Sequence, residues 1–542
     1  MNMYTDDMQN SIKKVIENRK NNIETEPKRM TAEQKKDILN TYHPEYKDTG
    51  FKIIKIGPNK NEKSPTQFVQ LLHSKSKILG INIDLSKVDY DVDVLIIGGG
   101  GAGASAAIEA HKAGATTLIA TKLRMGDSNT IMAEGGIQAA NKENDSPRQH
   151  FIDAFGGGHF NAKRELLKSL VMDGPLAISW LSSLGMMFDK QEDGTMITTH
   201  GGGTSRKRMH AAKDVTGAEI ARVLRDEVKN LKIPVVEHTA AIELIKDDNG
   251  NAAGAILLNT LTGQYMVAKS KTVIIATGGS GRMHYHGFPT SNHYGATADG
   301  LVMAYRAGAK LMHHESIQYH PTGTAWPPQI YGALITEKTR AIGAMMVNVE
   351  GNVFCHPLET RDVASAAIIR ETQERKKGLK TTLGQTVWLD TPMIDIKNGQ
   401  GFLEKRIPGM MHMFLNYGID PRQVPILIYP TFHYQNGGID VEKESHTKTI
   451  PNLYAAGEVA GGIHGTNRLM GNSLLDIIVF GRIAGKNAAS QSKTIKIGNL
   501  SLQHVNDYAN EIDNLGIDTG ETSPLLYPKY ARDVSQNKNE AS

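Results

Sequence analysis

The stretch YDVDVLIIGGGGAGASAAIEAHKAGATTLIATK, from Tyr90 to Lys122, decides the fold of this chain. It reads as a buried strand, a glycine-rich turn, a helix of small residues and a second strand, which together make a βαβ unit. Gly98, Gly100 and Gly103 fit the pattern G-x-G-x-x-G directly after the first strand. Glycines at this spacing permit a tight turn and a close approach of pyrophosphate to the helix N-terminus. The stretch therefore predicts dinucleotide binding.

The second strand of this unit ends at Thr121 and Lys122 without an acidic residue. A standard NAD site places an acid there to bind the adenosine ribose. Two more strand-glycine signals follow, TVIIATGGSGR from Thr272 to Arg282 and AAGEV from Ala455 to Val459. Three strand ends of one sheet that all approach one cofactor favour FAD over NAD, because FAD is longer and contacts more of the fold.

Composition excludes several classes of protein. A chain of 542 residues with 39% apolar content predicts two or three domains, and a net charge of +4 is too small to indicate a nucleic-acid partner. Cys355 is the only cysteine, which excludes a disulfide framework and a cysteine-held iron–sulfur cluster within the chain. No apolar run approaches the roughly 20 residues that span a bilayer, and the start lacks the apolar core of a signal peptide. We expect a cytoplasmic protein that reaches a membrane only through partner subunits.

The first 90 residues differ from the rest of the chain in their high content of charged residues. They hold 16 basic and 12 acidic residues, an excess that equals the net charge of the whole chain. Within them, Ser64 to Ile81 spaces apolar residues at helical intervals and predicts one docking helix. A solvated arm that partly covers its own domain is favoured over an arm that binds a partner.

Seven motifs follow one another along the chain. They are SNTIMAEGGIQAA (128–140), ATGGSGR (276–282), YHPTG (319–323), ITEKTR (335–340), TRDVASAA (360–367), PTFHYQNGG (430–438) and HGTNRLMGNSLLD (464–476). With these motifs the chain, over roughly Asp91 to Ala489, resembles the flavoprotein subunit of fumarate reductase and succinate dehydrogenase. L-aspartate oxidase is a close relative in the same family.

The resemblance implies an α/β fold: a Rossmann-like FAD-binding domain interrupted by an α+β capping domain, with the active site between them. The expected division is a charged N-terminal arm over 1–90, the FAD-binding domain over 91–311 and 429–490, and the capping domain over 312–428. A short helical or disordered C-terminal tail is expected over 491–542.

The motifs also make chemical sense. Reduction of an alkene between two carboxylates needs a hydride at one carbon, a proton at its neighbour, and cationic or hydrogen-bonding groups on both carboxylates. The resemblance assigns one carboxylate to His320 and Thr336, and the other to His433 and Arg468. An arginine held among small residues can grip a carboxylate bidentately.

The resemblance makes Arg361 the proton donor, with Glu337 and Arg340 as the relay that restores its proton. The guanidinium pKa, above about 12, suits protonation of a carbanion-like carbon when such a relay exists. The competing interpretation is a surface ion pair of Arg361 with the adjacent Asp362.

The resemblance also implies a set of cofactor contacts, in which the glycine turn from Gly98 to Gly103 holds the pyrophosphate. Asp299 and Glu458 are expected to bind ribityl or ribose hydroxyls, with helix capping as the alternative role. Ser473 and Leu474 are expected to offer backbone N–H groups to the isoalloxazine. The full set is Gly98, Gly99, Gly100, Gly101, Ala102, Gly103, Thr121, Lys122, Ser128, Asn129, Thr130, Gly135, Gly136, Asp299, Glu458, Ser473 and Leu474.

Asn129 departs from the family pattern. Most respiratory members have a histidine there, which is joined covalently to the flavin and raises its potential. Asparagine cannot form that bond, so we expect noncovalent FAD and a reductive direction.

These observations predict an FAD-dependent oxidoreductase acting on CH–CH groups, which reduces fumarate to succinate in anaerobic electron transport. The expected partner is a separate iron–sulfur electron-transfer subunit, although only about 50 residues follow Ala489 and family members carry a longer helical domain there. L-aspartate oxidase and a succinate dehydrogenase flavoprotein are the alternative enzymes. The four residues expected to bind the carboxylates, His320, Thr336, His433 and Arg468, are called the clamp residues. Arg361 and the two clamp histidines argue against a third alternative, a non-catalytic flavin-binding component.

Overall fold

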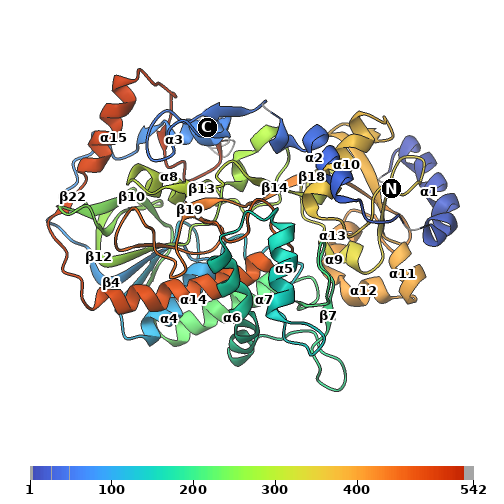
Figure 1. Cartoon of the computed structure of the whole chain (residues 1–542), viewed down its shortest axis with the longest axis horizontal. Helices are drawn as coiled ribbons and strands as arrows, with labels where there is room; N and C mark the ends of the chain where they lie inside the picture. The colour runs from blue at the N-terminus through green and yellow to red at the C-terminus, as the bar shows by residue number, and fades with distance from the viewer. Residues whose placement is uncertain (1–3, 26, 48, 530–542) are drawn as a thin grey trace, which may run out of the picture.

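The computed structural model describes residues 4–25, 27–47 and 49–529, and its largest sheet contains the βαβ unit (Figure 1). Strands β4 (Tyr90–Ile97) and β5 (Thr117–Ala120) pair in parallel, with Ile97 opposite Ala120, and helix α4 (Gly101–Lys112) connects them. The sheet order is β22 (Leu500–Ser501), β10 (Thr239–Asp247), β11 (Ala252–Asn259), β12 (Tyr265–Ile275), β4 (Tyr90–Ile97), β5 (Thr117–Ala120) and β9 (Val235–Val236), and β20 (Leu453–Ala455) also pairs with β12. The parallel half carries the three predicted glycine turns at its carboxyl ends.

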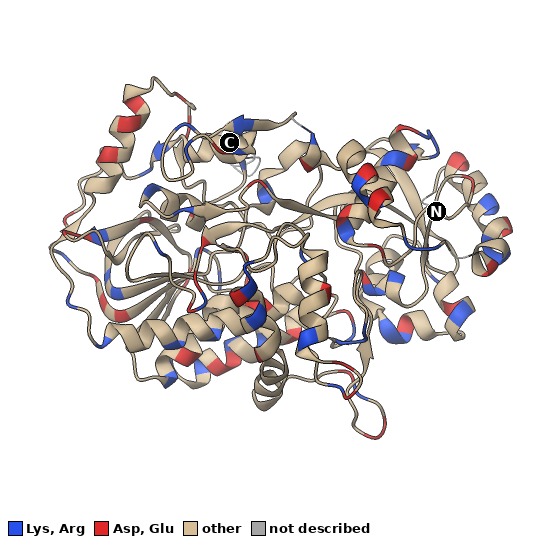
Figure 2. Cartoon of the chain, in the orientation of Figure 1, with Lys and Arg blue, Asp and Glu red and all other residues tan. Residues whose placement is uncertain are grey.

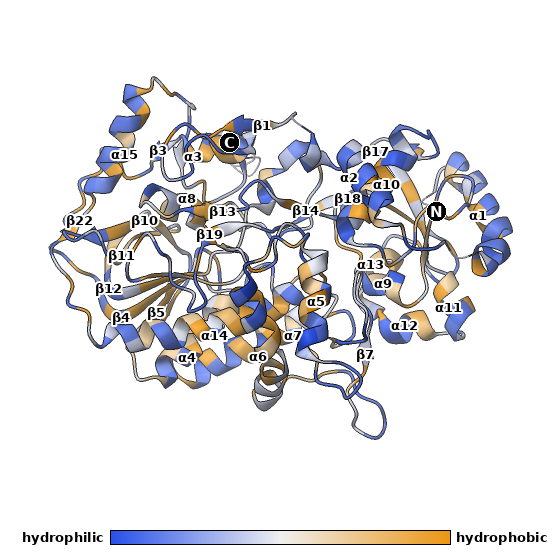
Figure 3. Ribbon diagram, viewed as in Figure 1, coloured by the Kyte–Doolittle hydropathy of each residue, from blue (hydrophilic) through white to orange (hydrophobic). Residues whose placement is uncertain are grey.

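Helices cover both faces of this sheet. One face holds α4 (Gly101–Lys112), α6 (Arg164–Ser183), α7 (Thr216–Asn230) and α14 (Asn472–Ser492), whereas α8 (Asp299–Arg306) lies across the other (Figure 1). The strands β4, β5 and β12 are hydrophobic along most of their length (Figure 3). Helices α4 and α14 pack closely because their contact residues are small: a Cβ on Gly481 would lie 2.6 Å from the Ala102 carbonyl oxygen.

A second, antiparallel sheet has its own hydrophobic core around Trp388. Its order is β14 (Ile317–Thr324), β18 (Ile426–Gln435), β17 (Gly384–Asp390) and β15 (Met345–Val347), with β16 (Leu379–Thr381) beside β17. Its helices are α9 (Lys338–Ala341), α10 (Arg361–Gln373), α11 (Met393–Asn398), α12 (Phe402–Arg406) and α13 (Pro408–Leu415). We propose the domain division expected from the sequence; the separate core over this region supports it.

Shorter elements lie outside these two sheets. They are α5 (Pro147–Gly157), β6 (Ile137–Gln138), β7 (Thr198–Thr199), β8 (Met209–His210), β13 (Leu311–Met312), β19 (Gly438–Asp440), β21 (Ala460–Gly461) and four 3₁₀ turns, η1 (Pro44–Tyr46), η2 (Gly281–Met283), η3 (Tyr285–Gly287) and η4 (Pro328–Ile330).

The N-terminal arm begins with two helices that the sequence interpretation missed, α1 (Asp6–Glu24) and α2 (Ala32–Tyr42). Helix α1 packs on the antiparallel sheet, where Ser11 accepts a 2.8 Å hydrogen bond from the Trp388 indole and donates to the Val349 carbonyl. Farther along, the arm reaches the larger core, where the Tyr305 hydroxyl donates to the Ile56 carbonyl over 2.7 Å. The arm thus packs on its own chain and spans both cores.

The rest of the arm forms β1 (Phe51–Ile53), β2 (Lys63–Pro65), α3 (Thr66–Leu72) and β3 (Lys75–Ser76). The helix expected over 64–81 is therefore too long. The apolar spacing continues beyond Leu72, but the helix ends there, and β3 then pairs with β23 (Thr522–Ser523) from the far end of the chain. Local periodicity carries no information about such a distant partner.

The C-terminal segment contains the one expected helix, α15 (Gln503–Asn514). It then returns to the larger core, where the Leu526 N–H donates to Asp299 and the Tyr527 ring lies near Lys122. Of the stretch expected to be disordered, residues 530–542 lie outside the described residues. Within the described part, no helix combines the length and apolarity required to cross a membrane.

Candidate functional site

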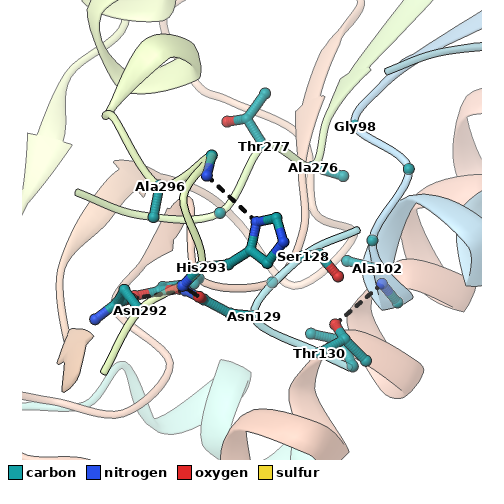
Figure 4. A pocket seen from close by; sticks show the side chains of 18 of the residues that line it. Gly98, Ala102, Ser128, Asn129, Thr130, Ala276, Thr277, Asn292, His293 and Ala296 are labelled. Atoms are coloured by element: carbon teal, nitrogen blue, oxygen red, sulfur yellow. Dashed lines mark hydrogen bonds between the residues drawn. The ribbon is translucent and has the colours of Figure 1, made fainter. Parts of the chain in front are cut away.

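A long pocket runs along the carboxyl ends of the parallel strands (Figure 4). Of the residues expected to contact FAD, all but Gly103, Gly135 and Gly136 line it. The Thr277 hydroxyl, also in its lining, is buried and has no hydrogen-bond partner within the described part of the chain.

The glycine turn fits a pyrophosphate because it has no room for side chains. Gly98 has φ of +120°, and a Cβ there would meet the Ala276 carbonyl oxygen at 2.3 Å. Gly103 faces the turn from α4, where a Cβ would lie 1.9 Å from the Gly98 oxygen. Thr130 accepts a 3.1 Å hydrogen bond from the Gly101 N–H, which positions the helix start.

Charged and polar groups also line this pocket. Lys122 donates to Asp299 over 2.6 Å. The end of β5, which lacks an acidic residue of its own, therefore carries a lysine paired with an aspartate from a distant part of the chain. Burial raises the pKa of Glu458, which accepts from the Gln435 N–H. Ser473 and Leu474 lie in the first turn of α14, whose N-terminal amides favour negative charge.

Asn129 is held in the pocket wall by its neighbours. Its amide nitrogen donates to Asn292 over 2.7 Å and to Glu458 over 3.1 Å, and its oxygen accepts a 2.6 Å hydrogen bond from the His293 N–H. Figure 4 shows the side chains of Asn129 and Asn292 directed toward one another beside His293. Sequence reasoning missed Asn292 and His293, since no local pattern marks them as neighbours of residue 129.

The pocket reaches two of the predicted clamp residues, His433 and Arg468. The rings of His433 and His320 lie 5.0 Å apart, and the Arg468 guanidinium lies 4.2 Å from the centre of the Tyr434 ring. Arg468 Nε is buried without a hydrogen-bond partner among the described residues. An arginine donor left in this state fits an anionic ligand.

Both clamp histidines are neutral at pH 7. Burial, and then the positive charge of Arg361, lower the pKa of His320 and of His433 well below the ordinary value. The His320 Nδ1 accepts from the Thr322 N–H, so its proton resides on Nε2. His320 therefore offers a neutral N–H donor.

The predicted relay residues form a continuous buried chain. Arg361 Nε donates to Glu337 Oε2 over 2.9 Å, and Arg340 Nη2 lies 3.3 Å from the same oxygen. Burial alone would raise the pKa of Glu337, but the two arginines bring it below its ordinary value. The Gly202 N–H donates to the other carboxylate oxygen. Glu337 is thus a buried carboxylate shared by two cations.

Gln318 joins the relay to the clamp, and sequence reasoning missed it. Its Oε1 accepts from Arg361 Nη1 at 2.9 Å and from Arg468 Nη2 at 3.0 Å. It lies two positions before His320 on β14, so strand alternation places both on one face. That alternation is the signal in the sequence that could have identified Gln318 as a site residue.

The alternative interpretation of Arg361 is contradicted, whereas the role expected of Thr336 stays a prediction. Arg361 is 5% exposed and binds Glu337, so a surface ion pair with Asp362 is wrong; Asp362 instead lies 2.9 Å from His159. Thr336 is buried beside Gly135, whose Cβ position lies 3.6 Å from the Thr336 hydroxyl. Gly135 thus lies against the substrate-binding candidate Thr336.

Comparisons with known proteins agree with this geometry. A family model described as an FAD binding domain matches residues 93–474. The fumarate reductase (CoM/CoB) of Methanothermobacter marburgensis contains a chain that is 37% identical over 403 residues, which cover 72% of this chain and 71% of that protein. L-aspartate oxidase from Streptomyces coelicolor is 35% identical over 402 residues, 71% of this chain and 67% of that protein.

Solved structures agree as well. The FrdA chain of E. coli quinol fumarate reductase superposes with a TM-score of 0.70 at 30% identity, covering 79% of this chain and 74% of that one. Sdh1 of Mycobacterium smegmatis gives a TM-score of 0.66 at 35% identity, covering 78% and 72%. The chain therefore belongs to the family of FAD-dependent oxidoreductases that comprises the flavoprotein subunits of fumarate reductase and succinate dehydrogenase.

Proposed function

We propose that the protein reduces fumarate to succinate as the flavoprotein subunit of a fumarate reductase. The carrying observation is the buried chain Arg468, Gln318, Arg361, Glu337, which joins a carboxylate clamp to a proton relay beside the FAD pocket. FAD, when bound, supplies a hydride to one alkene carbon.

The residues of the chain do the remaining work. Neutral His320 and His433 donate hydrogen bonds to carboxylates, and Arg468 supplies charge in a site from which water is excluded. Arg361 gives a proton to the second alkene carbon. Glu337 and Arg340 then return a proton to Arg361, since Glu337 contacts both arginines.

The bound FAD is noncovalent in this proposal. Asn129 stands where a covalent histidine would be needed, and its amide is already committed to Asn292 and Glu458. Without that covalent bond the flavin potential stays low, which disfavours succinate oxidation and leaves fumarate reduction intact. The electrons come from a separate iron–sulfur protein.

The test compares two assays on the purified flavoprotein. Oxidation of reduced viologen that depends on fumarate supports the proposal. Dye reduction that depends on L-aspartate, with no fumarate-dependent activity, would identify an L-aspartate oxidase instead. A variant Lys20→Gln in α1 serves as the control for handling, because Lys20 is exposed and does not line the FAD pocket.

A further inference from the structure

A second cavity, of about 890 Å³, lies between the N-terminal arm and the two cores. Helix α2 forms one wall, α5 and the loop to Asn161 form another, and the N-terminal end of α10 forms a third. Figure 1 shows α2 beside α10. The cavity wall contributed by the arm carries Arg29, Lys35, Lys36, Leu39 and Asn40.

A single side chain, Gln318, contacts both this cavity and the two arginines of the site. It lines the cavity, while its Oε1 accepts hydrogen bonds from Arg361 and Arg468. Its Nε2 donates to Asn467 Oδ1 over 3.0 Å and to the Arg468 carbonyl over 2.7 Å. Asn467 also lines the cavity. Gln318 and Asn467 therefore form a polar part of the cavity wall next to the two arginines.

The clamp has little other access to solvent. Arg361, His320 and Arg468 are 5%, 1% and 2% exposed. The pocket that reaches His433 and Arg468 is lined by the residues that would hold FAD. A substrate that binds after FAD therefore needs a different route.

We propose that this cavity is the route by which the dicarboxylate reaches the clamp arginines, with α2 of the arm as its outer wall and Gln318 as its inner gate. The inference rests on the proposed function. When Gln318 swings aside, an arriving carboxylate replaces its Oε1 as the acceptor of Arg361 and Arg468. The arginines thus exchange one acceptor for another and are not left unpaired, so the cost of opening is confined to the two hydrogen bonds that Gln318 Nε2 donates to Asn467 and to the Arg468 carbonyl.

The cavity lining also contains the carboxylates Asp153, Glu315 and Asp362, which contact Arg208, His313 and His159 in turn, and Glu45, whose pKa is raised by burial. The fully exposed charges on the outer wall are cations, which suit a dianion. Arg29 and Lys36 are exposed on the arm at this cavity, and Lys35 lies 2.9 Å from the buried Glu359. Figure 2 shows basic and acidic residues interleaved along the arm helices. Exposed cations at a cavity mouth raise the association rate of an anion.

Site-directed labelling tests the route, because the native thiol does not interfere. Cys355 is 1% exposed, and burial raises the pKa of its thiol to about 12. The variant Asn40→Cys puts an exposed thiol on the cavity wall, and Lys20→Cys puts one on α1 as a matched control. Each holoenzyme is treated with fluorescein maleimide or with methyl methanethiosulfonate.

We expect the bulky label on Asn40→Cys to lower kcat/KM for fumarate by about tenfold or more, since it slows association. The small methylthio label should have little effect, and neither label should matter on Lys20→Cys. Asn161→Cys, on the opposite wall, provides a second variant if Asn40→Cys loses FAD or folds poorly. Equal kcat/KM for the labelled wall and control variants would overturn the proposal.

A second measurement separates this inference from the proposed function. If the unlabelled holoenzymes lack fumarate reduction, the proposed function fails, and the rate of the flavin absorbance change on mixing with succinate then tests the route alone. A slower change in the labelled wall variant supports it. The same rate with and without the label, or no absorbance change, overturns it.

Discussion

Arg361 Nε donates a 2.9 Å hydrogen bond to Glu337 Oε2, and both side chains are withdrawn from solvent. The two residues are 24 positions apart and come from the starts of α10 and α9. A buried guanidinium that shares its carboxylate with a second arginine can give up a proton at one end and regain it at the other. This relationship is the structural basis of the first two predictions.

Replacing Arg361 with Gln should reduce fumarate-dependent turnover by about 10²–10⁴-fold, the usual contribution of a general acid. FAD binding should persist, because Arg361 does not line the FAD pocket. Viologen oxidation measures the first quantity and the flavin absorbance of the purified protein the second. Arg375→Gln, an exposed arginine beyond the end of α10, is the matched control. An Arg361→Gln enzyme with normal turnover would exclude the proton-donor role.

Replacing Glu337 with Gln should destabilise the fold by about 3–5 kcal/mol, since it leaves two buried arginines without their counter-charge. Thermal unfolding followed by circular dichroism measures the effect. Glu350→Gln removes an exposed carboxylate paired with Lys377 and should leave the melting temperature unchanged. Equal melting temperatures for the two variants would show that the relay carboxylate is neutral in the folded protein.

The ion pair of Asp362 with His159 predicts a pH window of stability. Burial would raise the pKa of Asp362, but His159 and other hydrogen bonds lower it from 3.8 to about 2, so its contribution is present above pH 3.8 and is lost as the pH falls toward 2. Burial would lower the pKa of His159, but Asp362 raises it above 6.5, so its contribution is complete below pH 6.5 and is lost as the pH rises through the raised value. His159→Gln should therefore lower the melting temperature most between about pH 4 and 6.5. A difference in melting temperature that does not vary between pH 4 and 9 would contradict this pairing.

Gly103→Ala should yield protein with little bound FAD. Its Cβ would lie 1.9 Å from the Gly98 carbonyl oxygen, which must move and disturb the glycine turn. Gly174→Ala in α6 is the control, because the nearest atom to its Cβ position is 3.5 Å away. The ratio of flavin to protein absorbance compares them, and full FAD occupancy in Gly103→Ala would refute the fit of this turn to the cofactor.

Acid precipitation should release all FAD from the wild-type protein, because Asn129 cannot bond covalently to it. Asn129→Ala should also bind FAD more weakly, since the His293 N–H and the Glu458 carboxylate lose a partner in the pocket wall. Fluorescence titration of the apoprotein with FAD measures the affinity. Flavin that stays on the denatured wild-type chain would refute the noncovalent assignment.

The sequence by itself determined the α/β fold and the FAD pocket. These follow from local patterns: the run from Tyr90 to Lys122 fixes strand, turn and helix through glycine spacing and side-chain periodicity, whose causes lie within a few residues of one another. Ordered motifs also named the clamp and relay residues. Their convergence in one buried site agrees with that interpretation, and their roles stay predictions.

Only the tertiary structure decided which distant side chains meet. Gln318 bonds Arg468 across 150 positions, Asn129 is held by a histidine 164 positions away, and the arm closes a cavity against α10. A sequence pattern states which face a side chain occupies, but the partner on that face is set by how the two cores pack. For that reason the glycine turn could be read from the chain, whereas the gate at Gln318 could not.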